Sequence, residues 1–167
     1  MSLDVHEFVV TVVLAHQGSV KGRTYLQKVC YFVGKLMNQN LGYEPYYYGP
    51  YSEEIASATS DLVIYGVLEE TRAHLAGVTQ YSYRLDRDNP FVNQLREQKR
   101  QDISSVDKAT KKVLEMPMVG SVNSLAVAAK VHSILERGAT SMTDRELVQA
   151  AHTVSYTHLT LPTTERV

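Results

Sequence analysis

Histidine and cysteine, two residue types that often carry out chemistry in proteins, are few in this chain and widely spaced. The six histidines and one cysteine are His6, His16, Cys30, His74, His132, His152 and His158. No two of them show the H-x-x-x-H or C-x-x-C spacing by which short motifs bind metal ions. His132 lies among alanines and leucines, which is more typical of a histidine at the edge of a core than of a ligand. We therefore predict no metal site.

The sequence also gives no positive sign of catalysis. Cys30 lies on an apolar helical stripe without a designated base nearby, so we expect a small buried side chain and not a nucleophile. The glycine motifs G-x-x-x-x-G-K and G-x-G-x-x-G and the hydrolase motif G-x-S-x-G are absent from the sequence. We expect no catalytic residues, no cofactor and no enzymatic activity. A single cysteine fits a reduced, cytoplasmic environment.

A dense cluster of tyrosines is the most unusual feature of the sequence. Five of the eleven tyrosines lie close together, and these are Tyr43, Tyr46, Tyr47, Tyr48 and Tyr51. We expect residues 46–48 to form an extended strand, in which the outer two rings point to one face and the middle ring to the other. Because tyrosine is a good anchor at protein interfaces, one face of this strand is a candidate binding surface.

The binding hypothesis and its structural alternative involve the same residues. We hypothesise that a protein partner contacts the surface formed by Lys28, Tyr47, Tyr48 and Tyr51. The rings would supply buried area, and the lysine would supply a charge that orients the partner. In the alternative, the rings pack against the helices with their hydroxyls in water, and the lysine ties its helix to the strand. The sequence leaves both open.

The turn that follows the tyrosines has specific backbone chemistry. Gly49 can take backbone angles that other residues avoid, and Pro50 fixes its own φ. Ser52 can cap the first free N–H groups of a helix, and the acidic Glu53 and Glu54 then lie in the first turn, where they suit the helix dipole. We predict that Gly49, Pro50 and Ser52 form a structural turn between the strand and a helix.

The elements that position these residues follow from the apolar pattern. Apolar residues at i, i+3 and i+4 predict helices over residues 5–16, 24–37 and 52–65. Residues 78–85 alternate with the period of a half-buried strand, and they pair with a strand that begins at Val67. We expect about seven residues to join the two strands. Three helices followed by a β-hairpin are the parts of a winged helix.

The second half of the chain reads as mostly helical. We predict a helix over residues 91–115 with a break near Ser104-Ser105, and another helix around residues 125–135. Thr143 and Glu146 form a capping box that opens a last helix. The predicted fold class is therefore α+β, mostly helical, with a winged-helix-like core over residues 4–85 and a helical part over residues 88–153.

Composition and charge limit the classes of protein to which this chain can belong. The chain has 167 residues, which suits one domain, and its net charge of −1 gives no global attraction to nucleic acid or anionic lipid. No stretch approaches the roughly 20 apolar residues of a membrane span, and Asp4 and Glu7 stand where a signal peptide carries positive charge. Residues 154–167 resemble a translated sequencing adaptor, so we place the native single domain within residues 1–153.

Three short motifs carry a resemblance to a known family. They are the helix pattern Leu26, Lys28, Tyr31 and Phe32, the run Tyr48-Gly49-Pro50-Tyr51-Ser52, and the helix end Gly66-Val67-Leu68. Over residues 22–70 the chain resembles the YwgA family and the wider Panacea (SocA-like antitoxin) group. The resemblance implies a small winged-helix-like domain, often encoded by phages or mobile elements. It also implies a protein partner, since some members act as antitoxins that bind a toxin or as adaptors that deliver a client to a protease.

DNA binding is the alternative function for such a fold, and the charges argue against it. The helix in the recognition position, residues 52–65, carries Glu53, Glu54 and Asp61 and no lysine or arginine. A helix that enters the major groove needs cations for the phosphates and donors for guanine. A winged-helix DNA-binding regulator therefore stays the second hypothesis. The sequence does not fix the oligomeric state.

Overall fold

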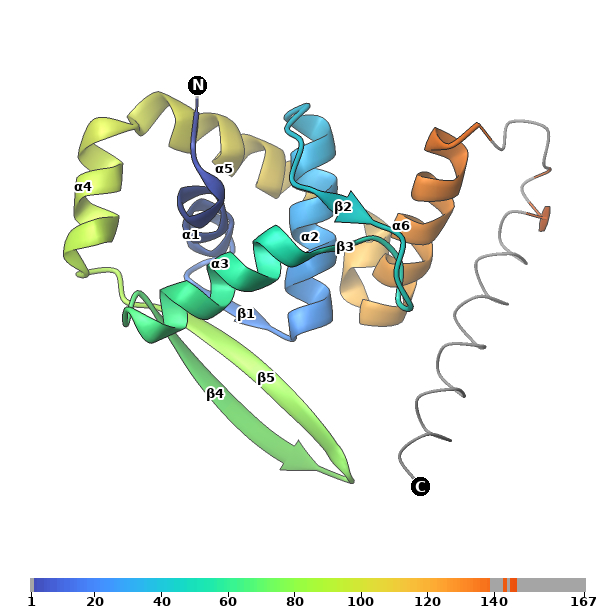
Figure 1. Cartoon of the computed structure of the whole chain (residues 1–167), viewed down its shortest axis with the longest axis horizontal. Coiled ribbons are helices and arrows are strands. Elements are labelled where there is room, and N and C mark those ends of the chain that lie inside the picture. The colour runs from blue at the N-terminus through green and yellow to red at the C-terminus, as the bar shows by residue number, and fades with distance from the viewer. Residues whose placement is uncertain (1, 139–142, 144, 147–167) are drawn as a thin grey trace.

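Helices dominate the described part of the chain, which also has five strands (Figure 1). The structure is a computed structural model, and it describes residues 2–138, 143, 145 and 146. The helices are α1 (Val5–Ala15), α2 (Arg23–Leu36), α3 (Glu53–Ile64), α4 (Pro90–Gln98), α5 (Arg100–Leu114), the 3₁₀ helix η1 (Pro117–Gly120) and α6 (Val122–Glu136). The strands are β1 (Ser19–Lys21), β2 (Tyr43–Glu44), β3 (Tyr51–Ser52), β4 (Leu68–Leu75) and β5 (Val78–Leu85). The predicted α+β, mostly helical fold is confirmed.

Helix α1 is the centre of the hydrophobic core. Its side chains at Phe8, Val9, Val12 and Val13 are all 0% exposed, because α3 and α5 pack around it. A helix that is apolar on all sides is stable only when neighbours cover it. Asp4 begins the helix as a capping box, in which the Glu7 amide donates to the aspartate and the Asp4 amide donates to the Glu7 side chain.

The main sheet contains a strand that the sequence did not reveal. Strand β1 pairs with β5, and β5 pairs with β4, all antiparallel, so the order is β1-β5-β4. We expected only a linker at β1. A strand of three residues is too short to show the alternation by which strands are recognised. Val20 at its centre is 1% exposed and lies opposite Tyr83 in the pairing register.

The hairpin β4–β5 has a tighter turn than the sequence predicts. Ala76 and Gly77 alone join the strands, and both have positive φ, at 50° and 78°. Positive φ at both central residues is the pattern of a type I′ turn, whose twist suits a two-residue hairpin. Our expectation of about seven connecting residues was wrong, because the outer half of β4 is exposed on both faces and shows no alternation. The hairpin extends away from the helical body (Figure 1).

The predicted strand over residues 46–48 is also wrong. The strands lie on either side of it, where β2 pairs with β3 in the register Tyr43↔Ser52 and Glu44↔Tyr51. The tyrosines between them form a turn. Pro45 and Pro50 flank this turn, and a proline has no N–H to extend the ladder. The three rings therefore do not alternate between the two faces of a strand.

The helical second half departs from the prediction at one point. The break in the long helical segment is at Lys99, between α4 and α5, and not near Ser104-Ser105. Lys99 has non-helical backbone angles, and its ammonium bonds the Ser2 carbonyl and the Glu7 carboxylate. These contacts hold the break over the beginning of α1.

Helix α6 agrees with the prediction around residues 125–135. The capping box at Thr143 and Glu146 is formed, since each backbone N–H bonds the other side chain. The rest of the predicted last helix lies outside the described residues. So do residues 154–167, where we expect a translated adaptor, and the boundary at residue 153.

Candidate functional site

Two lysine side chains hold the turn that contains Tyr46, Tyr47 and Tyr48. Lys28 on α2 is 2% exposed, and its Nζ donates to the Pro50 carbonyl at 2.7 Å. Lys130 on α6 donates to the Tyr47 carbonyl at 2.5 Å. In a helix or a sheet, backbone N–H groups would donate hydrogen bonds to these carbonyls. In this turn the two lysine side chains donate instead. The turn is thus tied to two helices that are distant in sequence.

Ser52 and Gln27 fix the far end of the same turn. The Ser52 hydroxyl accepts a bond from the Ile55 amide at 3.1 Å, so this residue is the N-cap of α3, and it also donates to the Leu41 carbonyl. The Gln27 side chain donates to the Ser52 carbonyl at 2.9 Å and accepts from the Ser52 amide at 3.0 Å. All of these groups are buried, where each hydrogen bond contributes most.

Gly49 lets α6 approach the turn closely. Its φ is 102°, a conformation that residues with a side chain rarely adopt. A Cβ at this position would lie 3.1 Å from Cγ of Lys130 and 3.2 Å from the Ala126 carbonyl oxygen. The glycine is therefore required twice, by its backbone angles and by the space beside it.

The tyrosine rings on this turn form an ordered aromatic surface. Tyr46 stacks on Tyr47 with 4.7 Å between ring centroids, and it packs against Tyr51 at 4.9 Å. Tyr46 is 50% exposed, and Tyr47 and Tyr48 are each 41% exposed. We call Tyr46, Tyr47, Tyr48 and Tyr51 the tyrosine turn. It combines exposed ring area with a backbone that is already held in place.

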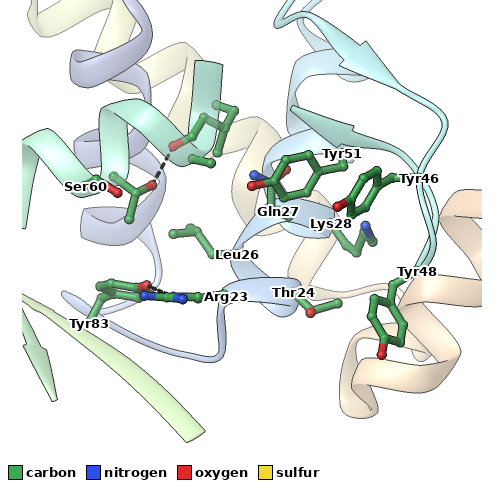
Figure 2. Close-up of a pocket in the computed structure, with 13 residues that line it drawn as sticks. Arg23, Thr24, Leu26, Gln27, Lys28, Tyr46, Tyr48, Tyr51, Ser60 and Tyr83 are labelled. Carbon is green, nitrogen blue, oxygen red and sulfur yellow. Dashed lines mark hydrogen bonds between the residues drawn. The ribbon is translucent and has the colours of Figure 1, made fainter. Parts of the chain in front are cut away.

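A cavity of about 250 Å³ opens beside the tyrosine turn (Figure 2). Helix α2 supplies one wall, α3 and the tyrosine turn supply the others, and Tyr83 of β5 closes one end. Its polar lining from α2 consists of Arg23, Thr24, Gln27 and Lys28. Tyr47 is not among the lining residues, so the exposed surface and the cavity are two separate features of one turn.

Arg23 at the edge of the cavity belongs to a cluster on the sheet. Its guanidinium lies 3.6 Å from the centre of the Tyr81 ring, and its Nε donates to the Tyr83 hydroxyl at 3.1 Å. Arg23 and Arg72 both contact Glu70. Burial acts to raise the pKa of Glu70, but hydrogen bonds from Arg72, Tyr83 and Arg23 outweigh it, and the pKa is lowered. Glu70 is therefore an ionised partner of the arginines.

Lys28 is electrostatically unusual. Burial, and then the positive charge of Lys130, lower its pKa to about 8. The structure does not place this lysine as a surface charge that orients a partner, because the ammonium is buried under the turn. For Lys28 the structure matches the alternative in which the lysine ties its helix to the tyrosine segment.

The structure brings together residues that the sequence kept apart. Of the four residues predicted to bind a partner, Lys28, Tyr48 and Tyr51 line one cavity. Sequence reasoning missed Lys130 and Tyr83, which are far from the tyrosines along the chain. No local pattern marks them, and only the packing of α6 and β5 against α2 brings them close.

The other candidate side chains are packed in the interior. Cys30 is 0% exposed, and burial raises the pKa of its thiol, which disfavours the reactive thiolate. Nδ1 of His132 lies 2.8 Å from the Tyr31 hydroxyl, and its ring packs edge-on against Tyr31 and Phe32. Among residues 2–138, 143, 145 and 146, no three His, Cys, Asp or Glu side chains gather as metal ligands would. In the same part of the chain, no helix is long and apolar enough to cross a membrane.

Part of the chain is similar to a protein that is known from its sequence. The chain is 38% identical over 76 residues to YwgA of Bacillus subtilis, which is described as an uncharacterized protein. The match covers 44% of this chain and 45% of YwgA, so the chain matches less than half the length of that relative. No family model matches the chain. The comparisons therefore support a YwgA-like sequence over part of the chain.

Proposed function

We propose that this protein is a non-catalytic interaction module that binds a protein partner through the tyrosine turn. The observation that carries the proposal is the stacked, half-exposed rings of Tyr46 and Tyr47 on a turn that two buried lysines fix. Exposed tyrosines anchor many interfaces, because their rings bury a large area and their hydroxyls tolerate water.

The rigidity of the turn favours binding. Gly49, Pro50 and Ser52 are all held by groups of neighbouring elements, so the rings are ordered before a partner arrives. A surface that is already ordered loses little conformational entropy on binding, and more of the interaction energy remains as affinity.

The resemblance to YwgA and the Panacea group suggests the kind of partner. Antitoxins and proteolysis adaptors of that group act by binding proteins, so we propose a toxin, or a protease and its client, as the partner of this chain. The buried, unpaired Cys30 fits a cytoplasmic setting. We propose that the module acts by binding and has no catalytic activity.

The DNA-binding alternative has less support. Helix α3 begins with Glu53 and Glu54, both exposed, and its Asp61 carboxylate bonds His6. Phosphates would repel this helix at neutral pH. The hairpin carries Arg72 and Arg84, but each pairs with a glutamate of β4.

Photo-crosslinking in the host cell tests the proposal. A photoreactive phenylalanine derivative is placed at Tyr47 in one protein and at Tyr65 in a control. Tyr65 at the end of α3 is 76% exposed and lies outside the tyrosine turn, so it reports non-specific collisions. We expect one discrete protein adduct from position 47 and none of that mass from position 65. Equal adducts from both positions, or adducts to DNA alone, would contradict the proposal.

A further inference from the structure

The cavity beside the tyrosine turn contains a buried cation whose charge is balanced by no acidic side chain among the residues that the structure describes. Lys28 is 2% exposed, and its ammonium donates a hydrogen bond to the Pro50 carbonyl. Within the described part of the chain, no carboxylate pairs with it. Lys130 adds a second positive charge nearby. Buried charges are normally paired, because an ion removed from water loses its solvation.

The lining of the cavity has a second cation, Arg23, whose own partner Glu70 lies outside the lining. No aspartate or glutamate is among its thirteen lining residues. Arg23, Thr24 and Gln27 of α2 contribute further donors, and Figure 2 shows Arg23 beside Tyr83 and Lys28 beside Tyr46 and Tyr51. Helix α2 begins at Arg23, and its N-cap Gly22 has no side-chain cap for the first amides.

Part of the cavity lining is aromatic. Tyr46, Tyr48 and Tyr51 line it from the turn, and Leu26 and Ile55 add apolar area. The volume of about 250 Å³ exceeds the roughly 150 Å³ of a cavity that accepts benzene. The space thus suits an organic molecule and is larger than a bare inorganic ion requires.

We infer that this cavity binds a small organic anion, whose carboxylate or phosphate oxygens accept hydrogen bonds from Lys28 and whose body packs against the tyrosine rings. An ammonium carries several N–H donors, and the Pro50 carbonyl uses one of them. The inference goes beyond the proposed function and does not rest on it, since Tyr47 lies outside the cavity.

Four small molecules distinguish the contribution of the ligand's negative charge from that of its aromatic ring. Phenyl phosphate and benzoate carry both, inorganic phosphate carries only charge, and benzyl alcohol carries only a ring. Isothermal titration of the full chain at pH 7 is expected to show phenyl phosphate or benzoate binding at least about tenfold tighter than either control, as one charge-assisted hydrogen bond implies. Equal binding of benzyl alcohol would overturn the inference, and so would failure of both aromatic anions.

A pair of lysine variants locates the site. Lys28→Met keeps the apolar stem and removes the charge, and it is expected to lose the affinity for the anion by about tenfold or more. Lys35→Met makes the same change on the same helix, where the ammonium pairs with Glu136 outside the cavity, and it is expected to bind normally. Equal affinities of the two variants would overturn the inference.

Because Lys28 also holds the turn, the wild-type protein is tested without any substitution. Lysine side chains are labelled with ¹³C at Cε, and phenyl phosphate is added. The Lys28 resonance is expected to shift in a saturable way while the Lys35 resonance stays in place. Parallel, non-saturating shifts of both would show an adventitious charge effect and overturn the inference. Persistence of the Tyr47 adduct in Lys28→Met would show that partner binding is a separate property.

Discussion

At the scale of single residues, Gly49 controls the tyrosine turn. We expect Gly49→Val to lower the free energy of unfolding by about 1–3 kcal/mol, the usual range for a residue held in a disfavoured backbone conformation. The new side chain would also press on Lys130 and the Ala126 carbonyl. Denaturant unfolding measures the loss. Gly120→Val is the matched control, because nothing lies within 4 Å of a Cβ there. Equal stability of the two variants would show that Gly49 is an ordinary position.

Lys28 makes stability depend on pH in a defined direction. Its pKa falls from 10.5 in the unfolded chain to about 8 in the folded protein, where burial and then the Lys130 charge disfavour the ammonium. Between these two pH values the unfolded state binds more protons, so the free energy of unfolding rises with pH. The destabilising effect is complete below pH 8 and is relieved as the pH approaches 10.5.

Comparison with Lys28→Met isolates this effect. Lys130 and Tyr51 titrate in both proteins, so their contributions largely cancel in the difference. We expect the stability of the wild type relative to the variant to rise by about 2 kcal/mol between pH 7 and pH 10. Urea titrations at both pH values give the difference. A constant difference would mean that Lys28 keeps an ordinary pKa.

At the scale of elements, a substitution in the β4–β5 turn is expected to stabilise the protein. Ala76 has a φ of 50°, which asparagine tolerates better than alanine, and an Asn-Gly pair is favoured in type I′ turns. Ala76→Asn is therefore expected to stabilise the protein by about 0.5 kcal/mol. Ala73→Asn, in the exposed middle of β4, serves as the control and is expected to be neutral or destabilising. Thermal melting ranks the two, and a lower melting temperature for Ala76→Asn would contradict the turn assignment.

The elements also show what local sequence can predict. Helices α1, α2 and α3 were predictable to within a residue at each end, because burial of one face requires a regular apolar period, whereas the break between α4 and α5 was not. Strand β1 was not, since three residues carry no period and its pairing with β5 is a long-range contact. The strand expected at residues 46–48 failed for a local reason, as the flanking prolines stop the ladder on both sides.

At the scale of the whole molecule, the tyrosine turn is where three separate parts of the chain meet. Helix α2, the turn and α6 come together through Lys28 and Lys130, and β5 adds Tyr83 to the cavity. The exposed rings and the cavity with the buried Lys28 thus lie at the same turn. The sequence predicted the aromatic surface, because its residues are adjacent. It did not predict the cavity, because the cavity depends on packing between distant helices.

The central claim is that the exposed rings of the tyrosine turn bind a protein. Its most direct test is the affinity of the partner, identified by crosslinking from position 47, for two purified variants. Tyr47→Ala removes a ring of the surface, and Tyr65→Ala removes an exposed ring elsewhere. Circular dichroism and thermal melting first establish that both variants fold. We predict that Tyr47→Ala weakens binding by about tenfold or more, the effect of losing a hot-spot residue, while Tyr65→Ala binds like the wild type. Unchanged affinity of a folded Tyr47→Ala protein would contradict the claim and leave the rings a structural role only.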